Sequence, residues 1–149
     1  MDLTSPPDCP YYLVYRVSLA VTSALKKGLA DAGVGNLKPA YLGVLLALWF
    51  QDRLRAVELC KKAGLEPSSM TGLLDRMERD GLVKRTPDPD DRRAIQIHLT
   101  PEGTAAMKPA NAAVTAVLDS VFAGIPDADI ETTKQVLRTV LLNCSQEEA

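Results

Sequence analysis

The chain has few of the residue types on which several classes of protein depend. Aromatic residues make up 5% of its 149 residues, a low share that suits a helical protein. His98 is its only histidine, so a Ser-His-Asp arrangement or a histidine metal cluster has too few ligands within one chain. A glycine-rich phosphate-binding loop is also missing. The sequence therefore predicts no enzyme, no metal site and no cofactor.

Disulfide and membrane signals are missing as well. The three cysteines, Cys9, Cys60 and Cys144, are odd in number and far apart, which favours reduced thiols. No apolar run reaches the roughly 18 residues of a membrane span, and the start, MDLTSPPDCP, has neither a basic region nor an apolar signal core. We expect a cytoplasmic protein without membrane contact, folded as one compact subunit over residues 1–149. Because the net charge is −2, any nucleic-acid surface must be local.

Apolar residues recur at helical spacing in several segments of the chain. Residues 11–32 carry apolar side chains at helical spacing, and AYLGVLLALWFQ is apolar around most of its circumference, as in a buried helix. Residues 56–63 form a tighter amphipathic pattern, followed by Gly64 where a left-handed C-cap is expected. Pro67 can then occupy the first turn of another amphipathic helix. Two short helices with a turn of about three residues between them predict a helix-turn-helix.

The second of these helices, residues 67–80, has a polar face opposite its apolar stripe. That face consists of Ser68, Ser69, Thr71, Gly72, Asp75, Arg76 and Arg79. Small residues near the start of a helix let its backbone approach the floor of a major groove, and arginines further along reach phosphates. A solvated amphipathic helix with no partner would show the same pattern.

A β-hairpin is predicted directly after the helix-turn-helix. Residues 82–86 read as one strand, and in residues 94–99 apolar and polar side chains alternate as in a strand with one buried face. Residues 87–93, with two prolines, form the tip. Thr100 and Pro101 then supply the N-cap and first position of a long helix over 101–123, followed by another over 127–143. A hairpin in this position is a wing.

The stretches SSMTGLLDRMERDGLVKR and DDRRAIQIHLTPEG resemble the MarR family of winged helix-turn-helix transcriptional regulators. Asp91 and Arg93 match the D-x-R of the family's wing signature, and Leu99, Thr100 and Gly103 match its L-T-x-x-G. The resemblance covers residues 38–107. It implies a mainly α fold with a small β-hairpin wing. In that fold a winged helix-turn-helix lobe over 38–100 is flanked by dimerisation helices over 11–32 and 101–144.

The resemblance also implies a function. A homodimeric repressor of this family would bind double-stranded DNA at a pseudo-palindromic site, with its recognition helices about 34 Å apart. Arg92 or Arg93 would enter the minor groove, with Arg93 the better candidate, and Asp91 would hold an arginine in position. Across residues 76–93, six basic side chains oppose five acidic ones, so nonspecific affinity should be modest and dependent on salt.

Three residues depart from the family pattern, of which Glu66 stands for the usual aspartate before Pro67. Gly72 stands where many relatives carry an arginine or lysine, so base readout is expected to use Ser69 and Thr71 instead. Arg55 replaces the usual serine or threonine cap before the first helix of the motif, which costs at most about 1 kcal/mol of local stability.

Two alternatives are open for the regulatory signal, and a third concerns the function itself. The family commonly accommodates small, often aromatic, anions or phenols, and a pocket for such an effector could be lined by Tyr12, Tyr15, Arg16, Tyr41 and Trp49, which could equally be packing residues. The stretch AYLGVLLALWFQD also resembles the peroxide-sensing branch, in which case Cys9, near the start of the first helix, is the redox sensor. A winged helix that docks proteins rather than DNA is the third alternative.

Overall fold

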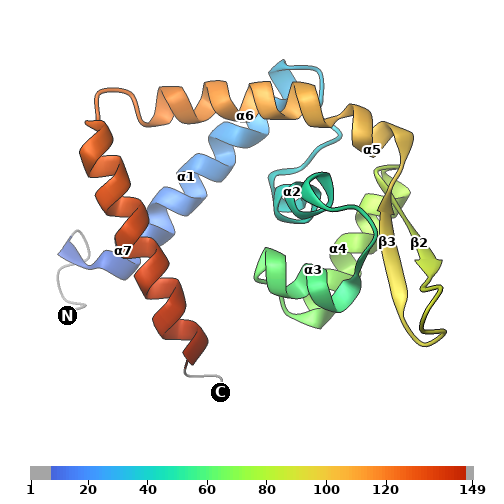
Figure 1. Cartoon of the computed structure of the whole chain (residues 1–149). Coiled ribbons are helices and arrows are strands. Elements are labelled where there is room, and N and C mark those ends of the chain that lie inside the picture. Colours follow the sequence, from blue (N-terminus) through green and yellow to red (C-terminus); the bar gives the residue numbers. More distant parts are fainter. Residues whose placement is uncertain (1–7, 147–149) are drawn as a thin grey trace. The chain divides into compact units, whose positions relative to one another are not determined.

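The computed structural model describes residues 8–146 and divides the chain into two compact units, Met1–Val117 and Leu118–Ala149 (Figure 1). The helices and strands, in chain order, are α1 Pro10–Asp31, the short 3-10 helix η2 Pro39–Tyr41, α2 Leu42–Phe50, β1 Leu54–Arg55, α3 Ala56–Ala63, α4 Pro67–Arg79, β2 Val83–Pro87, β3 Ile95–Leu99, α5 Pro101–Ala105, α6 Met107–Val121 and α7 Asp127–Gln146. The fold is mainly α with a small antiparallel sheet, as predicted.

The core of the first unit gathers the apolar stripes of α2, α3 and α4 against the sheet. Its buried members are Leu29, Leu37, Tyr41, Val44, Leu45, Leu48, Leu54, Leu59, Met70, Leu73, Leu74, Met77, Leu82, Val83, Ile97, Ala110 and Ala113. All four apolar residues of the α4 stripe, Met70, Leu73, Leu74 and Met77, belong to it. Burial of this stripe fixes which face of α4 remains at the surface.

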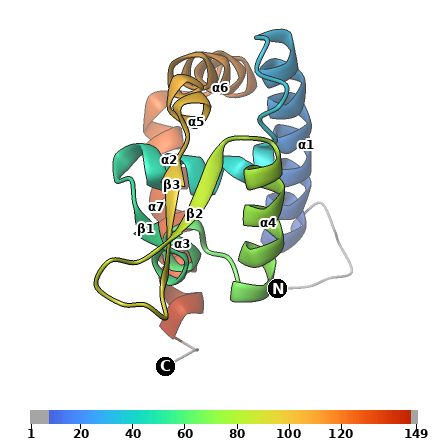
Figure 2. The same ribbon diagram turned by 90° about the vertical axis from the view of Figure 1, so that its right-hand side faces the viewer.

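The sheet has three strands in the order β1-β3-β2, with both pairs antiparallel. In the hairpin, Val83 lies opposite Leu99 and Pro87 opposite Ile95, so the connecting loop runs over residues 88–94. Figure 2 shows β2 and β3 side by side, with the loop between them projecting past the end of the sheet. The two-residue strand β1, which sequence periodicity did not indicate, pairs Arg55 with Gln96 on the other side of β3.

The single helix predicted over 101–123 is wrong, because the structure divides it into α5 and α6 at Ala106. Pro109 explains the break, since it has no N–H to donate to the carbonyl of Ala105 and its ring crowds that carbonyl. It is tolerated in the first turn of α6. The predicted cap is correct, because Thr100 Oγ1 accepts a 3.0 Å hydrogen bond from the N–H of Gly103.

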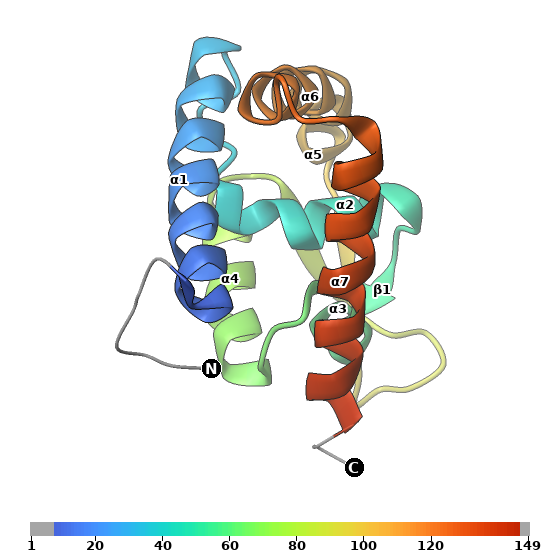
Figure 3. The ribbon, with the colours of Figure 1, turned by 90° about the vertical axis from the view of Figure 1, so that its left-hand side faces the viewer.

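The second unit consists of the last turn of α6, a short connection and α7. Figure 3 shows α7, and separately α1 in the first unit, each as one continuous helix. Both helices expose many apolar side chains. In α7 these are Val136, Leu137, Val140, Leu141 and Leu142, and in α1 they are Tyr11, Leu13, Val14, Tyr15, Val17 and Leu19. Within residues 8–146, no helix is both long and apolar enough to cross a membrane.

Candidate nucleic-acid interface

The turn between α3 and α4 has the geometry that its sequence predicts. Gly64 has φ of +64°, the left-handed conformation that glycine adopts without steric cost, and the N–H of Leu65 reaches back to the carbonyl of Cys60 at 3.0 Å. Pro67 is the first residue of α4, where its missing N–H removes no helical bond. Helices α3 and α4 therefore form a helix-turn-helix with the boundaries expected from the sequence.

The polar face of α4 lies at the surface. Ser68, Ser69, Thr71, Arg76 and Arg79 are exposed, and Gly72 is half-buried. The Thr71 hydroxyl donates to the carbonyl of Pro67 at 3.0 Å, so only its oxygen lone pairs are available to a partner. A Cβ placed on Gly72 would meet only the end of the Arg76 side chain, at 3.9 Å. The backbone at this point of α4 is open to close approach.

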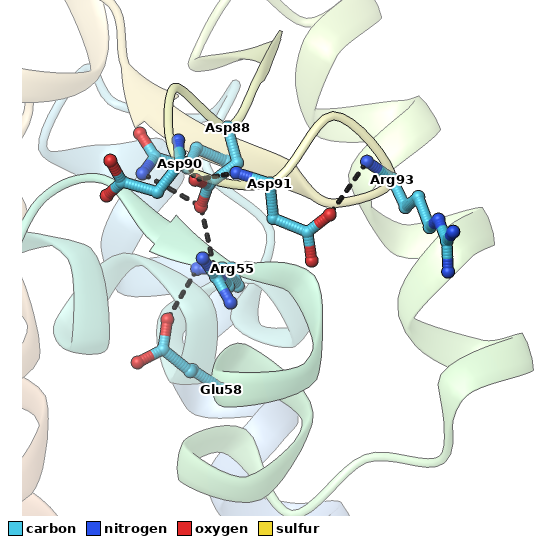
Figure 4. Close-up of polar contacts among 7 residues, drawn as sticks. Arg55, Glu58, Asp88, Asp90, Asp91 and Arg93 are labelled. Carbon is cyan, nitrogen blue, oxygen red and sulfur yellow. Dashed lines mark hydrogen bonds and ion pairs between the residues drawn. The ribbon is translucent and has the colours of Figure 1, made fainter.

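The wing loop exposes the side chains of Arg92 and Arg93. The Asp91 carboxylate accepts a 3.0 Å hydrogen bond from the backbone N–H of Arg93, so the expected link between these residues is made to the main chain and not to the guanidinium. In Figure 4 the Arg93 side chain points away from the carboxylates of the loop. Among the described residues, no ion pair involves Arg76, Arg79, Arg92 or Arg93.

A buried carboxylate at the base of the wing was missed by the sequence analysis. The side chain of Asp88 is 1% exposed, and its Oδ2 lies 2.6 Å from Nε of Arg55. Its Oδ1 accepts the backbone N–H groups of Asp90 and Asp91, at 2.8 and 3.1 Å (Figure 4). The Arg55 guanidinium, followed by the Asp90 N–H, lowers the pKa of Asp88 to about 2. No sequence signal links residues 33 positions apart, although Arg55 was already unusual as a helix cap.

Arg85 is a second residue that the sequence analysis did not single out. Its guanidinium forms ion pairs with Asp75 at 2.7 Å and Glu78 at 2.8 Å, and it also donates to the carbonyl of Thr71 at 3.3 Å. All three partners belong to α4, whereas Arg85 belongs to β2. Arg85 therefore fixes the wing strand to the helix, and its charge is already neutralised within the protein.

The predicted effector residues lie in different environments. Tyr41 is fully buried, and its hydroxyl donates to Asp80 at 2.6 Å, which together with Lys38 lowers the pKa of that carboxyl. Trp49 donates from Nε1 to the carbonyl of Gly103 at 2.9 Å. Tyr41 and Trp49 thus hold the lobe together.

The other three predicted effector residues lie on α1. Arg16 donates to the Tyr12 hydroxyl at 3.3 Å and lies over its ring, and Tyr15 is exposed. An effector site that uses these residues stays a prediction.

The three cysteines differ in environment. Cys9 immediately precedes α1 and is 3% exposed, so it does not lie in a frayed terminus. Cys60 is half-buried against the core, in agreement with its predicted packing role, and Cys144 is exposed. A redox role of Cys9 stays a prediction.

A helix-turn-helix followed directly by a hairpin that projects two exposed arginines defines a winged helix-turn-helix of the DNA-binding type. Comparison with known proteins identifies the family. The MarR family model matches residues 37–95. A MarR-family transcriptional regulator from Rhodococcus sp. RHA1 is 33% identical over 87% of this chain and 89% of its own, with a TM-score of 0.74. The chain belongs to the MarR family of transcriptional regulators.

Two further relatives bear on regulation. The crystal structure of CouR from Rhodococcus jostii RHA1, bound to p-coumaroyl-CoA, is 30% identical over 91% of this chain and 94% of its own, with a TM-score of 0.76. The organic hydroperoxide resistance transcriptional regulator of Bacillus subtilis is 32% identical over 62% of this chain and 60% of its own length. The chain spans about half the length of the curated Bacillus subtilis regulators that it matches at 38% and 34% identity.

Proposed function

We propose that this MarR-family regulator is a homodimeric repressor that binds a pseudo-palindromic DNA site and is released by a small ligand. One observation carries the DNA-binding part. The exposed face of α4 and the wing tip present four arginines that form no ion pair with a carboxylate of the described chain. In this arrangement α4 enters a major groove through Ser69, Thr71 and Gly72, and Arg93 enters the neighbouring minor groove.

Exposed apolar side chains support the homodimer. In α7, Leu141 is 68% exposed and Leu142 is 62% exposed, and the second unit has a hollow of about 500 Å³ lined largely by Leu118, Phe122, Ile125, Ile130 and Leu137. Contiguous apolar surface of this kind marks association sites in soluble proteins. Light scattering should give twice the chain mass of 16.1 kDa. A monomer at micromolar concentration would contradict the dimer.

The DNA-binding proposal is tested by selecting sites from a random or genomic pool and measuring affinity for the enriched site across a salt series. Arg93→Ala should weaken binding and lower the salt slope by about 1, because one phosphate or groove contact of a cation is lost. Lys108→Ala removes an exposed cation outside the interface and is the matched control. If Arg93→Ala binds like the parent, the wing takes no part in DNA binding.

The nature of the releasing signal divides two candidate functions. A small anion or phenol is favoured by the relative that binds p-coumaroyl-CoA. A thiol switch at Cys9 is favoured by the hydroperoxide-resistance relative and by the position of Cys9 at the N-cap of α1. Adding an organic hydroperoxide to the protein–DNA complex separates them. Release that Cys9→Ser abolishes selects the thiol switch, and release unaffected by that variant excludes it.

A further inference from the structure

The Asp88 carboxylate is surrounded by hydrogen-bond donors. Its Oδ1 accepts two backbone N–H groups of the loop, and its Oδ2 accepts Nε of Arg55 at 2.6 Å and Nε2 of Gln96 at 3.2 Å. Four donors use the acceptor capacity of an ionised carboxylate. The whole Asp88 residue is 3% exposed. A buried charge persists only when hydrogen bonds and an ion pair of this kind replace its lost hydration.

The four donors come from three different elements. Arg55 is the last residue of β1 and the cap of α3, Gln96 belongs to β3, and the two N–H groups belong to the loop itself. Arg55 is in turn fixed at its own N–H, which donates to Glu58 Oε2 in the first turn of α3 at 2.7 Å. A continuous path of polar contacts therefore leads from α3 through Arg55 and Asp88 to the backbone of the wing loop.

The path continues to the arginine at the wing tip. Asp88 holds the N–H of Asp91, and the Asp91 carboxylate holds the N–H of Arg93. Beyond the hairpin pairs, which end at Pro87 and Ile95, the loop backbone also has bonds from Asp88 to Ala94 and from Ala94 to Asp91. The loop is thus closed on itself, and its link to α3 runs through Arg55.

We propose that Arg55 and Asp88 are a positioning pair, which anchors the wing loop to the start of α3 and thereby sets where Arg92 and Arg93 lie relative to α4. The inference rests on the proposed DNA binding, because its consequence is a wing arginine placed in register with the recognition helix. Helix α3 is a suitable anchor since it contacts α4, and its Leu59 belongs to the same buried core as Met70 and Leu74 of α4. Arg55 acts through the wing arginines and not by touching DNA.

A double-mutant cycle separates this role from a general one. Arg55→Gln should lower affinity for the selected site about 10-fold in the parent chain and less than about 2-fold in an Arg92→Ala/Arg93→Ala background. The coupling arises because an anchor has no effect once the side chains it positions are gone. Arg53→Gln, an exposed arginine two residues away, makes the same change in charge and should leave affinity unchanged. An equal loss in both backgrounds would overturn the proposal.

Amide hydrogen exchange provides a readout that does not require DNA. Arg55→Gln should accelerate exchange at Asp90, Asp91 and Arg93 by about 10-fold or more, while residues of α4 keep parental rates. Asp88→Asn is the second variant, since it keeps one carbonyl oxygen for the loop amides but loses the ion pair. If the parent protein selects no DNA site, the proposed DNA binding is wrong. Amide hydrogen exchange then still tests whether Arg55 anchors the wing loop. If the parent binds and loop exchange is unchanged in both variants, the anchor is refuted.

Discussion

Gly72 allows the stability of α4 and its approach to DNA to be separated by a single methyl group. It lies inside α4 with no positive φ, and a Cβ there would meet only a flexible arginine end at 3.9 Å. Gly72→Ala should therefore stabilise the protein by about 1 kcal/mol, since alanine loses less backbone entropy than glycine in a helix. For a chain of this size the midpoint of thermal unfolding should rise by roughly 2–4 °C.

The same substitution should weaken DNA binding. If the backbone at Gly72 touches the groove floor, an added methyl group in a packed interface costs about 1–3 kcal/mol, which corresponds to roughly 5- to 150-fold in affinity. Thermal unfolding by circular dichroism and fluorescence anisotropy with the selected DNA site measure the two effects. Parental affinity in a stabilised Gly72→Ala variant would refute close approach of the backbone at this position.

Gly81→Ala is a control in which the added methyl group should destabilise the protein rather than stabilise it. Gly81 has nothing within 4 Å of an added Cβ, but its φ is +76°, where a side chain is strained by about 1–2 kcal/mol. Gly81→Ala should therefore lower the unfolding midpoint although it also adds one methyl group into open space. A stabilised Gly81→Ala, or a destabilised Gly72→Ala, would contradict the assignment of these two backbone conformations.

Three further predictions concern the scaffold of the interface. Gly103→Ala should destabilise the protein by about 1–3 kcal/mol in urea unfolding, because its Cβ would lie 2.1 Å from the carbonyl oxygen of Leu82; parental stability would show that α5 shifts freely. Tyr41→Phe should cost about 1.5–3 kcal/mol, since it removes a buried donor to the charged Asp80, and a neutral effect would mean that the bond contributes nothing. For Asp88, the folded-state pKa of about 2 lies below the ordinary aspartate pKa of 3.8. Its contribution to stability is therefore complete above pH 4 and lost as pH falls towards 2, so the amide shifts of Asp90 and Asp91 should titrate near pH 2; a midpoint near 4 would contradict the ion pair.

The helix-turn-helix could be predicted from sequence because its determinants are local. The apolar period of α4, the left-handed Gly64 and Pro67 at the helix start each act within one or two turns of the chain, and together they fix both helix boundaries. The second hairpin strand was equally predictable, from its alternation of apolar and polar residues. The break at Ala106 was not predicted, although Pro109 disrupts the helical turn that precedes it.

The polar contacts that hold the interface could not be predicted, because each joins segments far apart in sequence. Arg55 and Asp88 are 33 positions apart, and Tyr41 and Asp80 are 39. Which aspartate of PDPDD is buried depends on how the loop closes, and the D-x-R signature drew attention to Asp91 instead. Tyr41 shows the same limit, since the sequence does not indicate that its hydroxyl donates to Asp80.

The charge balance of the interface also changes once these pairs are known. In the sequence, acidic residues of 76–93 nearly cancel the basic ones, yet three of the five acids are paired: Glu78 with Arg85, Asp80 with Lys38, and Asp88 with Arg55. Lys38 and Arg55 lie outside that segment, so the count omitted two cations. Because charges further apart than about 8 Å are screened at physiological salt, a DNA phosphate senses mainly the nearest side chains. On α4 and the wing these include cations without an ion-pair partner in the described chain: Arg76, Arg79, Lys84, Arg92 and Arg93. The salt slope of DNA binding should therefore be steeper than a net margin of one charge implies.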